Sequence, residues 1–211
     1  MIKKYAIANW KMNLSLNDIT KWLNNFQYTG NVKVLLAPSY PYLGLIDHTR
    51  CSAQNVSVKE QGSHTGETGI FQIKDFCTHC IIGHSERKES KKIVLEKRDL
   101  CLNNGVTPIV CLSNPEESYD YYRSGTLLAW EDPKNISVDG VLNQIDINEI
   151  KNVIYKMKKA LPEEAVLIYG GSVNRQNIPA LNNTTLIDGV LVGGASLDPQ
   201  HFMDIIKVLE K

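Results

Sequence analysis

Short apolar runs rich in β-forming residues recur along the whole chain, with stretches of helical periodicity between them. These runs occupy residues 4–9, 32–38, 51–56, 79–83, 107–112, 126–131, 165–170 and 188–193. Most of them are continuously apolar instead of alternating with polar residues, which is typical of parallel strands covered on both faces. Eight such strands separated by helices predict an α/β fold that closes into a (β/α)8 barrel, with a doubly wound open sheet as the alternative.

Helical patterns fill the intervals between the strands. The longer ones lie at 16–26, 86–104, 147–161 and 199–211, and shorter helices are expected after Pro38, at 115–123 and at 175–181. The pattern at 86–104 repeats Ile93, Leu95, Leu100 and Leu102 on one rough face and stops before Gly105, a residue type that commonly ends helices. No linker interrupts the alternation, so residues 1–211 are expected to form one domain. Neither common glycine-rich nucleotide motif is present to support the open sheet.

The charge balance restricts the partners of this chain. Lys plus Arg and Asp plus Glu both number 23, so the formal net charge is zero. Binding to nucleic acid or to a membrane surface requires a basic excess or a basic block, so neither partner is expected. No stretch approaches the roughly 20 apolar residues of a spanning helix. The start, MIKKYAIANW, lacks the long apolar region of a secretory signal, and a cytoplasmic protein is therefore expected.

The cysteines are expected to be buried thiols. They stand at positions 51, 77, 80, 101 and 111, an odd number in largely apolar surroundings. The string CTHCIIGH brings Cys77, His79, Cys80 and His84 close together in sequence, and zinc sites use these residue types. However, four ligands must converge on one point, and an intervening strand would carry His84 about 13 Å beyond Cys80. No metal site is therefore expected.

Polar and glycine residues gather where the predicted strands end. In a barrel of this type, catalytic groups come from the carboxyl ends of the strands. Those ends carry Asn9, Lys11, His84, Glu86, Glu131, the string YGGSVN at 169–174 and the string GGAS at 193–196. Judged by its neighbours in TLLAWEDPKN, Glu131 is only the first polar residue of an Asp-Pro turn. Its place among the other polar strand ends favours a reactive carboxylate.

Each of these groups has a chemical use and a plainer alternative. The glycine pairs allow backbone N–H groups to approach a phosphate, with the hydroxyl of Ser172 beside them, or they simply turn the chain. Lys11 offers a positive charge to an anionic substrate, or it is a solvated surface lysine. Asn9 positions a neighbouring group or caps the loop. His84 lies at a strand-to-helix switch, where a helix dipole favours the neutral ring, or it is structural and bonded to loop backbone.

Taken together, these segments resemble the triosephosphate isomerase family. The matching strings are ANWKMN (8–13), TGE (65–67), IIGHSER (81–87), AWE (129–131), YGGSVN (169–174) and LVGGASL (191–197), in the order of the family. The combination of GHSER, YGGSVN and VGGASL is highly specific. The resemblance implies a TIM barrel that interconverts dihydroxyacetone phosphate and glyceraldehyde 3-phosphate through an enediolate, with no cofactor. An isomerase of another sugar phosphate and a non-catalytic phosphate-binding barrel are the alternatives.

The resemblance also implies a role for each polar strand end. Glu131 would be the general base at carbon, and His84 the neutral electrophile at oxygen, roles that are established for this family. Lys11, with Asn9 beside it, would hold the substrate and stabilise the enediolate, and Glu86 would keep Lys11 in place. Isomerisation of an α-hydroxy carbonyl needs a base, an acid and a fixed positive field, and these residues match those needs.

The phosphate would be bound by Ser172, Gly193 and Gly194, again by resemblance. The family closes a lid with a glycine-rich tip over this group, whereas the corresponding stretch here is DPKNISVDG (132–140). The backbone N–H of Ser137 could still reach the phosphate, but a negative charge at Asp139 would be unfavourable near a dianion.

Two further segments bear on assembly. The loop QGSHTGETG (61–69), with Thr65, Gly66 and Glu67, resembles the family segment that inserts into a neighbouring subunit, so a homodimer is expected. The connection from Cys111 to Glu131 has room for a short helix only, which predicts a thin outer wall at that point of the barrel.

Overall fold

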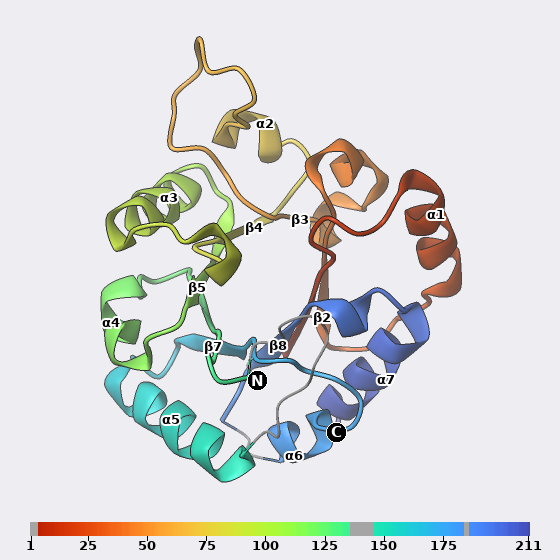
Figure 1. Ribbon diagram of the computed structural model, residues 1–211, viewed down its shortest axis with the longest axis vertical. Coiled ribbons are helices and arrows are strands. Elements are labelled where there is room, and N and C mark those ends of the chain that lie inside the picture. Colours follow the sequence, from red (N-terminus) through yellow and green to blue (C-terminus); the bar gives the residue numbers. More distant parts are fainter. Residues whose placement is uncertain (1–3, 136–145, 184–185) are drawn as a thin grey trace.

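Eight parallel strands form the centre of the protein. The computed structural model describes residues 4–135, 146–183 and 186–211. The strands are β1 (Tyr5–Asn9), β2 (Lys33–Ala37), β3 (Ser52–Ala53), β4 (His79–Ile82), β5 (Thr107–Leu112), β6 (Leu127–Trp130), β7 (Val166–Tyr169) and β8 (Gly189–Val192). They are paired in the order β2-β1-β8-β7-β6-β5-β4-β3, and a parallel bridge between Leu36 and Cys51 joins the two ends of that order. This arrangement confirms the predicted TIM barrel (Figure 1).

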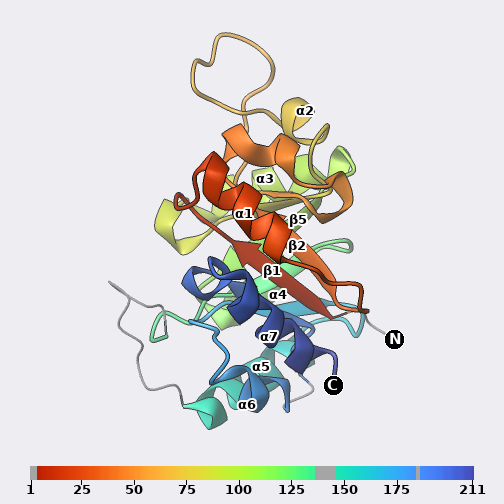
Figure 2. The same cartoon turned by 90° about the vertical axis from the view of Figure 1, so that its right-hand side faces the viewer.

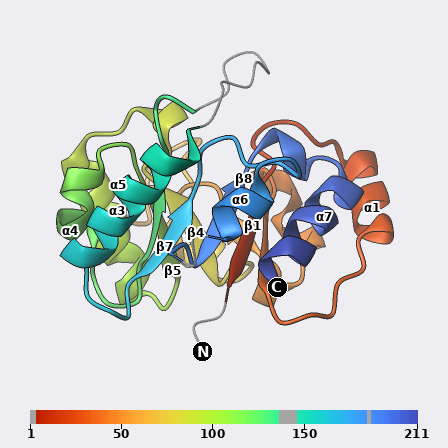
Figure 3. The same cartoon turned by 90° about the horizontal axis from the view of Figure 1, so that it is seen from below.

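Helices surround the strands on the outside (Figures 1 and 3). The α-helices are α1 (Leu16–Asn25), α2 (Ile70–Ile73), α3 (Lys91–Asn103), α4 (Ser118–Tyr121), α5 (Ile147–Ala160), α6 (Ile178–Asn182) and α7 (Pro199–Leu209). Short 3₁₀ helices lie at η1 (Tyr40–Leu45), η2 (His48–Arg50), η3 (Ser85–Arg87), η4 (Pro115–Glu117) and η5 (Gly194–Ser196). The long helices begin at side chains that accept backbone N–H groups, such as Ser15 for α1 and Asp146 for α5.

The strands bury both of their faces, which explains their continuously apolar sequences. Ile7, Leu35, Ile81, Ile109 and Ile168 belong to a cluster that fills the inside of the barrel. The neighbouring residues of each strand point outward into a second cluster, shared with the helices. Side chains fill the barrel, so a ligand must bind at its rim.

Helix α3 differs from its prediction in both its start and its buried face. It begins at Lys91 instead of residue 86, because Lys88 adopts a left-handed conformation with φ of 52° and Ser90 caps the helix. The buried residues of α3 are Val94, Lys97, Arg98 and Cys101, whereas Leu95 and Leu100 of the predicted face are only partly buried against the core. Lys97 is buried because its ammonium donates hydrogen bonds to Asn55 and Glu89, both at 2.6 Å. Polar pairing thus lets a charged residue share the buried face with the apolar Val94 and Cys101.

Strand β3 is shorter than predicted. The apolar run at 51–56 contributes only Ser52 and Ala53 to the ladder. The next residue, Gln54, uses its side-chain amide to donate 2.8 Å hydrogen bonds to the carbonyls of Ala37 and Lys11. A side chain thus takes over the pairing of the backbone as the chain leaves the sheet.

The short connection between β5 and β6 is confirmed. It contains η4 and the four-residue helix α4. The guanidinium of Arg98 donates hydrogen bonds to the carbonyl oxygens of Asp120 and Tyr121, at 3.0 and 3.1 Å, and thereby caps the end of α4. The outer wall is thin here but is tied to α3.

All five cysteines are buried and free of disulfides, as predicted. Cys51 and Cys77 lie in contact, with 3.2 Å between their sulfur atoms. Within the described ranges, no three His, Cys, Asp or Glu side chains are grouped so that they could hold a metal ion. The same ranges contain no helix that is both long enough and apolar enough to cross a bilayer.

Candidate active site

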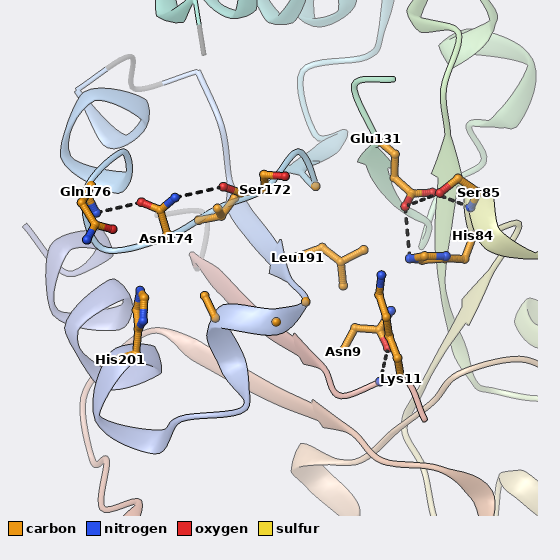
Figure 4. Close-up of a pocket in the computed structure, with 15 residues that line it drawn as sticks. Asn9, Lys11, His84, Ser85, Glu131, Ser172, Asn174, Gln176, Leu191 and His201 are labelled. Carbon is orange, nitrogen blue, oxygen red and sulfur yellow. Dashed lines mark hydrogen bonds and ion pairs between the residues drawn. The ribbon is translucent and has the colours of Figure 1, made fainter. Parts of the chain in front are cut away.

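A cavity of about 460 Å³ lies at the carboxyl ends of the strands (Figure 4). Its lining includes Glu131, His84 and Lys11 of the predicted catalytic set, and Asn9, Ser172, Gly193 and Gly194 of the predicted binding set. Residues from β1, β4, β6, β7 and β8 therefore meet at one rim, although they are far apart in the chain.

Glu131 directly follows β6 and is held on several sides. Its backbone N–H continues the ladder by donating to the carbonyl of Leu112 at 2.9 Å. One carboxylate oxygen, Oε2, accepts the backbone N–H of Ser85 at 2.8 Å, and Oε1 accepts the Ser85 hydroxyl at 3.1 Å. Although the residue is only 3% exposed, it lines the cavity. A carboxylate in this position is shielded from water but accessible to a bound ligand.

His84 has its two ring nitrogens in different environments. Nδ1 accepts the backbone N–H of Glu86 at 3.3 Å, at the start of η3. A neutral ring that accepts at Nδ1 carries its proton on Nε2. That Nε2 atom lies 3.1 Å from Oε1 of Glu131. The neutral imidazole is therefore oriented as a hydrogen-bond donor toward the cavity.

Lys11 is fixed at both its backbone and its ammonium. Its φ of 51° lies in the left-handed region, a strained conformation for a residue with a side chain. Its N–H donates to the side-chain oxygen of Asn9 at 3.1 Å, and its carbonyl accepts the Ser39 hydroxyl at 3.0 Å and the Gln54 amide at 2.8 Å. The ammonium donates to Oε1 of Glu86 at 2.5 Å. These bonds hold a positive charge at the edge of the cavity.

Glu86 itself does not line the cavity but supports the residues that do. Burial raises the pKa of its carboxyl, but the hydrogen bond and charge of Lys11 outweigh this, and the pKa is lowered overall. Glu86 is thus ionised as the partner of Lys11, while its backbone N–H orients His84.

The opposite half of the cavity presents backbone and a hydroxyl. Ser172 has a φ of 47°, and two amides, of Asn177 at 3.0 Å and Asn174 at 3.4 Å, donate to its carbonyl. Its own hydroxyl is buried and makes no hydrogen bond within the described residues. A Cβ atom added to Gly194 would meet no atom within 4 Å, so the space above this backbone is open. This half of the cavity has room and a donor for an anion.

The other predicted residues belong to the expected lid and to the loop at 61–69. Ser137, and most of the expected lid at 132–140, fall outside the described residues. Thr65, Gly66 and Glu67 are exposed on a loop that projects away from the barrel (Figures 1 and 2). They do not line the cavity.

Some cavity residues were not predicted. Ser85 stands inside the string GHSER, next to His84, and this position could have indicated its role. Gln176 and His201 form the outer edge of the cavity, but neither stands at the end of a strand. His201 accepts the backbone N–H of Arg175 at 3.0 Å, and burial together with the charge of Arg175 lowers its pKa. No pattern in the sequence indicated these two residues.

Comparisons with known proteins agree with this arrangement. The family model described as triosephosphate isomerase matches residues 4–209. A triosephosphate isomerase of Wolbachia pipientis wMel is 30% identical over 226 residues, covering 97% of this chain and 93% of the relative. One of Zygosaccharomyces bailii is 32% identical over 240 residues, covering 94% and 95%. The barrel fold, the residues gathered at its rim and the similarity to these relatives agree, and the chain belongs to the triosephosphate isomerase family.

Proposed function

We propose that this chain interconverts dihydroxyacetone phosphate and glyceraldehyde 3-phosphate, with Glu131, His84 and Lys11 as its catalytic residues. The observation that carries the proposal is the 3.1 Å contact between Glu131 Oε1 and His84 Nε2, in a cavity that Lys11 also lines. The relatives named triosephosphate isomerase support this activity over isomerisation of a larger sugar phosphate and over a non-catalytic role.

The three residues supply the three chemical functions that the reaction needs. Glu131 takes a proton from one substrate carbon and returns it to the neighbouring carbon. His84, donating from Nε2, polarises the carbonyl and moves protons between the two oxygens. The ammonium of Lys11 stabilises the negative charge of the enediolate between these steps.

Substrate would bind between groups that now contact each other. Glu131 and His84 are in direct contact, and Ser85 donates two hydrogen bonds to Glu131. A triose with its carbons against Glu131 and its oxygens against His84 would replace the contact between them. The carboxylate would then give up its hydrogen bonds with Ser85 and accept the proton from the substrate carbon.

The phosphate of the substrate would lie in the opposite half of the cavity. Ser172 supplies a free hydroxyl there, and Gly193 and Gly194 supply backbone that a dianion can approach closely. Ser137 is proposed as an additional backbone donor on the basis of family resemblance alone.

Replacement of Glu131 by Gln tests the proposal. The amide keeps the size of the side chain but cannot accept a proton from carbon, so kcat should fall by about 10²–10⁴-fold. Turnover of glyceraldehyde 3-phosphate is measured for the wild type, for Glu131→Gln and for Glu96→Gln, a control at an exposed glutamate of α3. Full activity in Glu131→Gln would show that another group is the base. A wild type that binds 2-phosphoglycolate without turning over substrate would favour the non-catalytic alternative.

We also propose that the protein is a single-domain, cytoplasmic homodimer that associates through the loop at 61–69. The projection of this loop supports the proposal, as does the exposure of Met12, an apolar side chain that is 92% exposed beside Lys11. Sedimentation velocity at micromolar protein concentration should give the mass of two chains. A purely monomeric species would contradict the proposal.

A further inference from the structure

Two buried polar side chains, those of Asp132 and Asn135, hold together the turn that follows Glu131. Asp132, Pro133, Lys134 and Asn135 form this turn, in which the Asn135 backbone N–H donates to the Asp132 carbonyl at 2.9 Å. The Asp132 carboxylate also accepts the Lys134 backbone N–H at 3.0 Å and the Asn135 side-chain amide at 2.5 Å. Asp132 and Asn135 are each only 7% exposed. Charge-assisted hydrogen bonds shielded from water make this turn rigid.

The turn packs on the end of β7. A Cβ atom added to Gly171 would lie 2.4 Å from the hydroxyl oxygen of Tyr169 and 3.3 Å from Cβ of Asn135. The absence of a side chain at Gly171 therefore lets both residues pack over its backbone. Burial, and next the negative charge of Asp132, raise the pKa of the Tyr169 phenol. Asp132 and Asn135 thus connect the chain after β6 to the neighbouring strand.

The position of Glu131 depends on both sides of its backbone. On the amino-terminal side, the ladder bond to Leu112 fixes it. On the carboxyl-terminal side, the chain passes directly into the 132–135 turn. Gly170, which follows β7, lies beside this side chain, since a Cβ atom added there would be in ordinary van der Waals contact, 3.4 Å, with Cγ of Glu131. Misplacement of a catalytic group by about 1 Å can lower a rate by roughly 10²-fold.

We propose that Asp132 and Asn135 are positioning residues for Glu131. Their paired side chains lock the turn against Tyr169 and Gly171, and the locked turn fixes the backbone from which the Glu131 carboxylate extends. Neither residue lines the cavity, so both act through Glu131 and not on the substrate. The inference rests on the proposed function, since the effect of positioning on rate requires that Glu131 be the base.

Exchanging the two side chains tests the pairing of Asp132 with Asn135 directly. Asn135→Asp places two buried carboxylates face to face, which should open the turn and lower kcat by about 10- to 100-fold, with KM changing less than about twofold. The double variant Asp132→Asn with Asn135→Asp restores one amide and one carboxylate in reversed positions, and should recover most of the lost kcat. Asn135→Ala, which removes the amide without adding charge, serves if Asn135→Asp does not fold.

Asp47→Ala is the matched control. Asp47 holds a turn in the same way, by accepting the Thr49 backbone N–H at 2.9 Å, but it is exposed and precedes η2, away from the cavity. Its loss should leave kcat and KM unchanged. Thermal unfolding of every variant is measured in parallel, because a merely structural turn would lower the melting temperature without separating kcat from KM.

The outcomes are distinct. Lowered kcat in Asn135→Asp with recovery in the swapped variant supports the proposal. Unchanged kcat, or a rise in KM alone, overturns it, as does a swapped variant that recovers nothing. Wild-type turnover is measured first: its absence contradicts the proposed function and with it the positioning role, whereas an active wild type with fully active Asn135→Asp and Asn135→Ala variants contradicts the positioning role alone.

Discussion

The two halves of the cavity hold their polar groups in opposite ways. In the proposed catalytic half, Glu131, His84 and Lys11 each have partners in the protein, at Ser85, the Glu86 backbone and the Glu86 carboxylate. In the proposed phosphate half, the Ser172 hydroxyl is buried but makes no hydrogen bond within the described part of the chain. Leu191 lies between the two halves in Figure 4. The groups proposed to act on the substrate carbons and oxygens are therefore oriented before substrate arrives, whereas the hydroxyl proposed to bind the phosphate is left available for it.

The largest effect that would test this comparison is expected at Lys11. Lys11→Met removes the charge that faces the enediolate, and kcat/KM should fall by about 10²–10³-fold. Lys91→Met is a matched control, because the Lys91 side chain is 37% exposed against 35% for Lys11, and it also pairs with a carboxylate, Asp120, at 2.6 Å. The steady-state kinetics of both variants are measured. An equal loss of activity in Lys11→Met and Lys91→Met would contradict the proposed role of Lys11.

A smaller effect is expected at Ser172, and it should fall on KM. Ser172→Ala removes one hydrogen bond to a dianion, so KM should rise about 10-fold while kcat changes less than about threefold. Thr126→Val is the control, since the Thr126 hydroxyl is also buried without a hydrogen bond among the described residues but lies outside the cavity. A loss of kcat with unchanged KM would instead place Ser172 in the catalytic half.

The fold could be predicted because the residues of each strand themselves mark it as a buried strand. Each continuously apolar run marks a strand buried on both faces, and the predicted and observed bounds mostly agree within one residue. The predictions differ from the structure where hydrogen bonds to distant segments override the local pattern of apolar residues. Lys97 is buried on α3 because of Asn55 and Glu89, and β3 is short because the Gln54 amide takes over its pairing. Asn55 is far from Lys97 in sequence, and the carbonyls that the Gln54 amide binds belong to the distant residues Ala37 and Lys11.

The candidate site was predictable to the same extent. Residues at the carboxyl ends of strands share a rim whatever their separation in the chain, so Glu131 and His84 could be brought together from the sequence. Gln176 and His201 could not, because Gln176 reaches the cavity from the turn before α6 and His201 from α7, and neither stands at the end of a strand. Glu131 directly follows β6 and also precedes the Asp-Pro turn, so its place at a strand end agrees with the sequence pattern, and its reactivity stays a prediction. The burial of that turn against Tyr169 required the structure.

The thin wall between β5 and β6 shows which contacts hold the strand that leads to Glu131. Strand β6 is paired with β5 and β7 along its whole length, from Leu127 to Trp130, so its neighbours in the sheet set the place of Glu131. The helix outside contributes a single turn, tied down by Arg98. The barrel can therefore carry a short outer connection at this point, because the sheet and not the outer helix holds the strand that leads to Glu131. This chain, at 211 residues, lies toward the small end of what such a barrel permits.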